Sequence, residues 1–142
     1  MAEKDVASIR YGRIAPCLEV REIHSAHDFY TQVLGFEKIF ENGSPVGFMA
    51  LKKDKAELHL SQKSDFKPTT TNVAHLFVDD VAALYDHCKQ HGVRIVKSLA
   101  YKDYGQQAFV LTDPDGNRID IGQRSDLRLT LGLALDPQNH VK

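Results

Sequence analysis

The sequence contains no tryptophan, only two cysteines and two methionines, and no surplus of charge of either sign. A formal net charge of -1 with scattered basic residues excludes the clustered Lys and Arg that bind a nucleic-acid backbone. No apolar run approaches the roughly 18 residues that cross a bilayer. The polar N-terminus, MAEKDVASIRYGR, lacks the apolar core of a secretory signal. We therefore expect a cytoplasmic protein that binds neither nucleic acid nor membrane, with Cys17 and Cys88 as free thiols.

The sequence repeats itself once. The segment Leu18-Glu19-Val20-Arg21-Glu22-Ile23 matches Leu76-Phe77-Val78-Asp79-Asp80-Val81. At nearly the same spacing, residues 48–51 match 109–112, and residues 58–62 match 119–123. Three matches in the same order predict a duplicated structural unit.

Each copy has the same predicted order of elements: a strand, an amphipathic helix closed by a glycine, and three more strands. Gly35 and Gly92 occupy the helix ends, where a left-handed turn favours glycine. Asp113-Pro114-Asp115-Gly116-Asn117 is a strong turn signal between the last two strands of the second copy, and Lys53-Asp54 is a weaker one in the first. The predicted strands are 14–20, 36–41, 46–52 and 55–61 in the first copy, and 73–78, 93–98, 106–112 and 117–123 in the second.

These elements predict an α+β fold of two tandem βαβββ modules, with curved mixed β-sheets enclosing a cleft and helices outside. The modules are expected at residues 13–63 and 72–124, joined by a linker at 64–71. Residues 1–12 form an N-terminal arm and residues 125–142 a C-terminal tail, whose alternating leucines predict a further strand at a dimer interface.

Alternation along the strands separates two faces. One is apolar and is expected to pack under the helices: Leu18, Val20, Leu58, Leu60, Leu76, Val78, Ile119 and Ile121. The other carries Cys17, Glu19, Glu57, His59, Ser61, His75, Phe77, Arg118 and Asp120. This second face is either a solvated sheet surface or, if the two copies curve toward each other, the lining of a ligand pocket.

The sequence resembles the vicinal oxygen chelate superfamily, which includes glyoxalase I, extradiol dioxygenases, and fosfomycin and bleomycin resistance proteins. The resemblance covers about residues 13–124. It is carried by Phe29-Tyr30-Thr31-Gln32-Val33-Leu34-Gly35-Phe36, Glu57-Leu58-His59-Leu60, Val78-Asp79-Asp80-Val81 and the turn at residues 113–117. Within the superfamily, Glu57-Leu58-His59-Leu60 and Ile121-Gly122-Gln123 are most similar to the bleomycin resistance branch.

The resemblance implies a homodimeric antibiotic-resistance protein that sequesters a small, bleomycin-like molecule in a cleft without catalysis. Aromatic side chains are then expected to stack on the ligand, and acidic ones to offset its positive charge. The expected ligand-binding residues are Glu19, Phe48, Glu57, His59, His75, Phe77, Tyr101, Tyr104, Phe109 and Asp120.

The alternative is a metal-dependent enzyme of glyoxalase or dioxygenase type. The superfamily's four metal-ligand positions correspond here to Ala15, His59, Val73 and Asp120, and two of these are aliphatic. No cofactor is therefore expected. A second possible ligand set for a divalent metal is Cys17, His59, His75 and Asp120. A purely structural role, with no ligand, is a third hypothesis.

Overall fold

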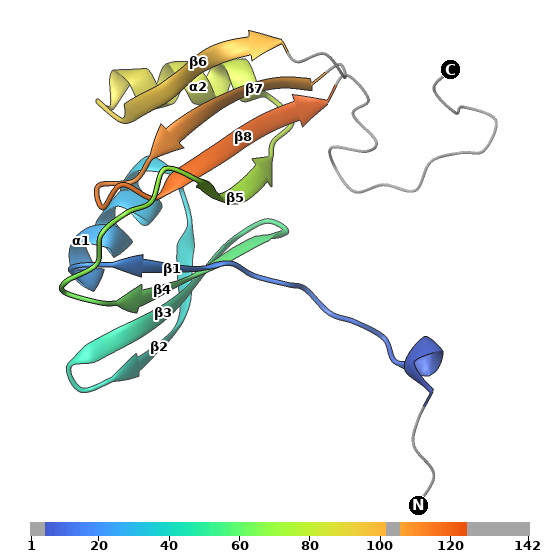
Figure 1. Ribbon diagram of the computed structural model, residues 1–142, viewed down its shortest axis with the longest axis vertical. Coiled ribbons are helices and arrows are strands. Elements are labelled where there is room, and N and C mark those ends of the chain that lie inside the picture. Colours follow the sequence, from blue (N-terminus) through green and yellow to red (C-terminus); the bar gives the residue numbers. More distant parts are fainter. Residues whose placement is uncertain (1–4, 102–105, 125–142) are drawn as a thin grey trace, which may run out of the picture.

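Two mixed four-stranded sheets, each with one helix, make up the part of the chain that the computed structural model describes, residues 5–101 and 106–124 (Figure 1). A short 3₁₀ turn, η1 (Val6–Ser8), lies in the N-terminal arm. The first module contains β1 (Cys17–Val20), α1 (Ile23–Asp28), the π-helical turn η2 (Phe29–Val33), β2 (Glu37–Gly43), β3 (Val46–Lys53) and β4 (Ala56–Gln62). The second contains β5 (Asn72–Phe77), α2 (Val81–Gln90), β6 (Arg94–Tyr101), β7 (Gln106–Thr112) and β8 (Arg118–Arg124).

The two sheets have equivalent strand orders, β1-β4-β3-β2 and β5-β8-β7-β6. In each, the first strand runs parallel to the last, and the remaining pairs are antiparallel. A parallel pair needs a long crossover, which the helix and the two intervening strands provide. The predicted α+β fold of two βαβββ modules is thus confirmed.

The two helices begin in the same way in both modules. The Gln62 side chain at the end of β4 accepts a hydrogen bond from the backbone N–H of Ile23 at 2.9 Å, and Gln123 at the end of β8 accepts one from Val81 at 2.7 Å. The Asp80 side chain also caps α2 by accepting from the N–H of Ala83. The glutamines occupy matching positions of the repeat, so the duplication preserves this capping as well as the strands.

The first helix differs from the single regular helix that the sequence predicted. After Asp28 it widens into η2, where the Leu34 N–H bonds to the Phe29 carbonyl. Such wider turns are rare and occur mostly inside α-helices. Tyr30, which is fully buried, lies in this turn.

The hydrophobic core lies on the faces of the two sheets that the helices cover. Leu18, Leu60 and Ile121 are at most 2% exposed, as the alternation predicted. Burying each such side chain contributes roughly 1.5–3 kcal/mol. Both modules contribute to one continuous cluster of buried residues, so neither has a separate core.

A buried carboxylate joins the second module to the first. Asp113, in the turn between β7 and β8, accepts a hydrogen bond from the Tyr30 hydroxyl at 2.7 Å and two backbone N–H bonds, from Asp115 and Asn117, at 2.9 Å. The Asn117 amide donates both to Asp113 and to the backbone carbonyl of Glu19. Burial raises the pKa of Asp113, although the bonds from Asn117 and Tyr30 act in the opposite direction. The predicted turn therefore also fixes how the modules pack together.

Within the described residues, no helix is long and apolar enough to cross a membrane. The cytoplasmic location stays a prediction. The tail at residues 125–142 lies outside the described residues, and the strand expected there stays a prediction too.

We predict that Tyr30→Phe lowers the free energy of unfolding by about 1.5–3 kcal/mol, because Asp113 loses a donor to a buried charged group. The control is Tyr85→Phe, because the Tyr85 ring packs against Phe109 and its hydroxyl has no hydrogen-bond partner among the residues that the structure describes. We expect this control to change stability by less than about 0.5 kcal/mol. Urea denaturation measures the free energy of unfolding of both variants. Equal losses of stability in the two would contradict the assigned role of the Tyr30 hydroxyl.

Candidate functional site

The uncovered face of the first sheet carries a row of rings beside acidic and thiol groups. We call it face A: Cys17, Glu19, Phe40, Phe48, Glu57, His59 and Ser61. The parallel register places Cys17 opposite His59, and the antiparallel register places Phe48 opposite Ser61. The ring centroids of Phe48 and His59 are 5.3 Å apart, and those of Phe40 and Phe48 are 6.2 Å apart. Three rings thus span neighbouring strands in edge-to-face contact.

Glu57 is the acidic centre of face A. One of its oxygens, Oε1, accepts from Arg13 Nε at 2.9 Å, with Arg13 Nη2 at 2.8 Å. The other, Oε2, is 2.9 Å from His59 Nε2. The hydrogen bond with His59, followed by the contacts of Arg13, lowers the pKa of Glu57. Glu57 is therefore ionised, and the guanidinium of Arg13 lies against its charge.

The corresponding surface of the second sheet, face B, carries His75, Phe77, Arg118 and Asp120. His75 and Asp120 are register partners on β5 and β8, and His75 Nδ1 lies 2.9 Å from Asp120 Oδ2. The His75 side chain is 63% exposed, and Phe77 is 42% exposed. Each sheet therefore holds a histidine–carboxylate pair on its uncovered face.

Faces A and B flank an opening between the two modules. Glu57 and His75 both border a hollow of about 150 Å³, whose walls are otherwise mostly apolar core side chains such as Leu58 and Ile121. A larger groove of about 450 Å³ shares part of this wall and is again mainly apolar. In one chain the cleft is thus open, and the predicted polar lining forms only its rims. The reason is that the apolar faces, which gain most from burial, occupy the space between the modules.

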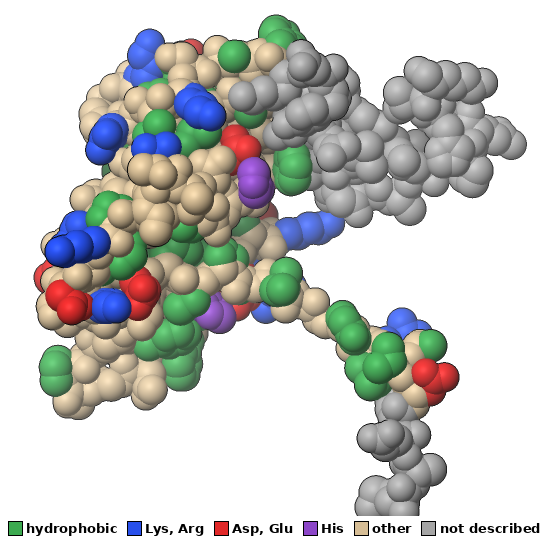
Figure 2. All heavy atoms as spheres, viewed as in Figure 1, with side chains coloured by type: hydrophobic (Ala, Val, Ile, Leu, Met, Phe, Trp, Pro, Cys, Tyr) green, Lys and Arg blue, Asp and Glu red, His purple; other side chains and the backbone are tan. Residues whose placement is uncertain are grey.

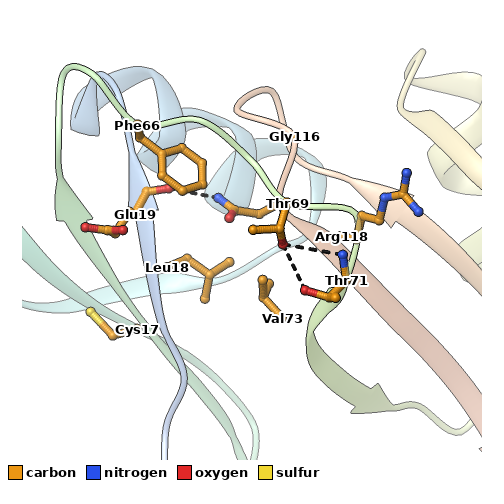
Figure 3. A pocket seen from close by; sticks show the side chains of 10 residues that line it. Cys17, Leu18, Glu19, Phe66, Thr69, Thr71, Val73, Gly116 and Arg118 are labelled. Carbon is orange, nitrogen blue, oxygen red and sulfur yellow. Dashed lines mark hydrogen bonds between the residues drawn. The ribbon is translucent and has the colours of Figure 1, made fainter.

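A smaller hollow lies where the linker passes between the modules (Figure 3). Cys17 and Glu19 line it from β1, and Val73 and Arg118 from the second sheet. The hydroxyls of Thr69 and Thr71 in the linker are bonded to each other at 2.8 Å. Phe66 of the linker and Glu19 of β1 also line this hollow, and the Asn117 amide donates to the Glu19 carbonyl beside it.

Not all predicted ligand-binding residues lie on these faces. Phe109 is 1% exposed and packs on Tyr85 in the core, so its expected position in the cleft is wrong. Tyr101 is 80% exposed, but its register with Gln107 directs it to the other side of the sheet from His75. Tyr104 lies outside the described residues. The alternation of β7 favours Phe109 as a core residue, because Leu111 shares its face.

The four alternative metal ligands separate into two pairs. Cys17 and His59 lie on face A, whereas His75 and Asp120 lie on face B. No group of three or more His, Cys, Asp or Glu side chains that could hold a metal occurs in residues 5–101 and 106–124. The described residues of one chain therefore do not bring Cys17, His59, His75 and Asp120 together, and this alternative ligand set stays a prediction.

Sequence reasoning missed two members of the site. Arg13 belongs to a segment that carries no repeat, and nothing in its neighbours indicated a contact with Glu57. Phe40 lies at the edge of the sheet, where a register irregularity in β2 disturbs the simple alternation. Only the pairing of β2 with β3 shows that Phe40 shares a face with Phe48.

Comparison with known proteins agrees with this architecture. Residues 11–121 match the model of the Glyoxalase/Bleomycin resistance protein/Dioxygenase superfamily. The chain belongs to this superfamily. No curated protein sequence matches the chain.

Solved structures of the superfamily share the fold. A bleomycin resistance determinant encoded on the transposon Tn5 is 25% identical, with a TM-score of 0.69 over 81% of this chain and 99% of that one. A bleomycin-binding protein complexed with bleomycin is also 25% identical, with a TM-score of 0.68 over 81% and 100% of the two chains. TioX from Micromonospora sp. ML1, at 16% identity, has a TM-score of 0.68 over 80% and 99%, which shows the fold alone.

We predict that the two thiols differ in reactivity. Burial raises the pKa of Cys88 to about 11, and burial together with the charge of Glu19 raises that of the exposed Cys17. Because the thiolate is the reacting form, a raised pKa lowers reactivity at neutral pH, and reactivity increases with pH. In the native protein, one thiol should react with a disulfide reagent, more slowly than free cysteine, and Cys17→Ser should abolish that reaction. Two reactive thiols before denaturation would contradict the buried position of Cys88.

Proposed function

We propose that this superfamily member is a bleomycin-resistance-like binding protein, which holds an aromatic, positively charged small molecule and does not transform it. The observation that supports this most is face A, where Phe40, Phe48 and His59 line up beside the ionised Glu57. Aromatic faces stack on planar ligands and attract cations, and a partly buried carboxylate offsets a ligand's positive charge. A neighbour of the same fold has bleomycin bound, which makes a molecule of that kind the first candidate.

The competing function is a metal-dependent enzyme of the same superfamily. Such an enzyme would need metal-binding side chains at the positions of Ala15 and Val73, which are aliphatic. Otherwise the pair Cys17 and His59 on the first sheet would have to meet the pair His75 and Asp120 on the second. The residues of one chain favour binding over metal catalysis. Elemental analysis of the purified protein tests this directly, since a stoichiometric divalent metal that is lost in His59→Ala would support the enzyme.

A second copy of the chain is the proposed cover for the open cleft. Large apolar side chains are exposed around it, among them Phe40 at 55%, Phe77 at 42% and Ile14 at 97%. Large exposed apolar side chains gathered in one region mark interaction sites. Pairing face A of one copy with face B of another in a two-fold dimer would bury these side chains and enclose two equivalent ligand sites.

The ligand site is tested by titrating bleomycin into the protein and its variants, with calorimetry as the measurement. Phe48→Ala removes the central ring of face A, and we expect it to weaken binding by roughly tenfold to a hundredfold, as loss of an aromatic anchor does. The control is Phe66→Ala, a phenylalanine of the linker whose ring centroid lies 5.7 Å from the Arg21 guanidinium. Phe66 borders the smaller hollow and is not part of the ring row of Phe40, Phe48 and His59.

We expect Phe66→Ala to bind with wild-type affinity. Equal weakening in both variants would indicate general destabilisation, and unchanged binding in Phe48→Ala would exclude face A as the site. If the wild-type protein binds no bleomycin, that ligand is wrong, and a thermal-shift panel of aromatic cations then tests the wider class.

The dimer is tested by Phe40→Asp, which places a charge at the exposed apolar rim of face A. We expect the wild-type protein to be dimeric and this variant to shift toward the monomer, because a charge buried without a partner opposes association. Light scattering coupled to gel filtration measures the mass. Ala82→Asp, on the exposed side of α2, should remain dimeric, and a monomeric wild-type protein would contradict the proposal.

A further inference from the structure

In the structure the N-terminal arm extends to residue 16, because β1 begins only at Cys17, and the side chain of Arg13 attaches it to face A. The arm precedes β1 and runs away from the two sheets toward the N-terminus (Figure 1). Its apolar side chains are exposed (Figure 2). Val6 is 66% and Tyr11 81% exposed. Among residues 5–101 and 106–124, the other hydrogen bonds of the arm are local ones around η1 and a bond from the His59 N–H to the Pro16 carbonyl just before β1. Arg13 is thus the outermost residue that links the arm to the sheet.

Arg13 binds the acid that the proposed function assigns to a ligand cation. Its Nε and Nη2 both approach Glu57 Oε1, while His59 holds the second oxygen. Both oxygens of Glu57 are therefore engaged, and the charge of the pair formed by Arg13 and Glu57 is neutral. A positively charged group that enters face A meets a carboxylate whose charge a guanidinium already offsets.

The two partners differ in how easily they can be displaced. The Arg13 side chain is 59% exposed, whereas that of Glu57 is 13% exposed and fixed on β4. Exposed ion pairs contribute little net stability and are screened by salt. Arg13 can consequently leave at small cost, while Glu57 stays beside the aromatic rings.

We propose that Arg13 is a resident cation that competes with positively charged ligands for Glu57 and so determines which ligands face A accepts. This inference rests on the proposed binding function. A cation bound at Glu57 displaces Arg13 and releases the arm from the sheet. A neutral or anionic ring gains nothing from that exchange, and it meets the intact ion pair.

The attachment of the arm is tested without any ligand, by limited digestion with trypsin and mass spectrometry. Cleavage after Arg13 requires its side chain to leave Glu57, whereas cleavage after Arg10, three residues earlier in the same arm, does not. We expect Glu57→Gln, or high salt in the wild-type protein, to accelerate cleavage after Arg13 several-fold relative to cleavage after Arg10. Glu41→Gln, which removes a carboxylate paired with Lys38 on β2, is the matched control and should change neither rate.

The competition is tested with ethidium as an aromatic cation and 1-anilinonaphthalene-8-sulfonate as an aromatic anion, both followed by fluorescence. Arg13→Gln should bind ethidium roughly threefold to tenfold more tightly than the wild-type protein, and Glu57→Gln more weakly than either. Arg10→Gln removes the same charge from the same arm and should leave ethidium affinity unchanged. Binding of the anion should not improve in Arg13→Gln.

The outcomes separate the two hypotheses. Equal ethidium affinity in Arg13→Gln, Arg10→Gln and the wild-type protein overturns the competition. Failure of all forms to bind ethidium overturns the proposed preference for cations, and the competition with it. Unchanged cleavage after Arg13 in Glu57→Gln overturns the attachment of the arm, whatever the ligand results.

Discussion

The carboxylate of Asp113 is the point at which the two modules are tied together. It lies in the turn between β7 and β8, yet it accepts a hydrogen bond from Tyr30 in the first module. Burial raises the pKa of Tyr30 well above its usual value, with a further increase from the charge of Asp113, so the hydroxyl keeps its proton as a donor. Asn117 and Asp115 extend the link to β1, through the Glu19 carbonyl and the Arg21 N–H. A buried carboxylate with so many partners fixes geometry, because each broken bond would leave a buried polar group unsatisfied.

That fixed junction determines where faces A and B can lie. The apolar strand faces and the helices fill the space between the modules, which directs the polar faces to the rims of an open cleft. A duplicated sequence would suggest that two similar faces meet around one hollow. In this chain they meet in two places: Glu57 and His75 border one hollow, and Cys17, Glu19 and Arg118 border the smaller hollow beside the linker.

Faces A and B each carry a histidine paired with a carboxylate, and on face A this pair lies beside aromatic rings. His59 with Glu57, and His75 with Asp120, hold each carboxylate in a defined position. Such pairs suit the recognition of a charged aromatic molecule, since orientation and charge are set before the ligand arrives. They also show why the acids of face A cannot be considered alone. Arg13, from a segment outside the repeat, already neutralises the acid that is best placed to bind a cation.

The sequence alone determined the elements and their faces, because alternation and turn chemistry are local. The turn at residues 113–117 and the buried residues Leu18 and Ile121 lie where they were predicted. The strands lie within three residues of their predicted bounds, although β1 begins at Cys17 instead of residue 14 and β6 continues to Tyr101 instead of residue 98. The repeat further predicted that both modules share one topology, and the superfamily comparison agrees.

Only the tertiary structure decided which side chains meet across the chain. It placed Phe109 in the core, Arg13 on Glu57, and the candidate metal ligands on two separate sheets. These outcomes depend on how the modules pack against each other and on where an arm without regular periodicity makes contact. Neither is encoded in the period of a single strand or helix, because both follow from the balance of burial and hydrogen bonding over the whole molecule.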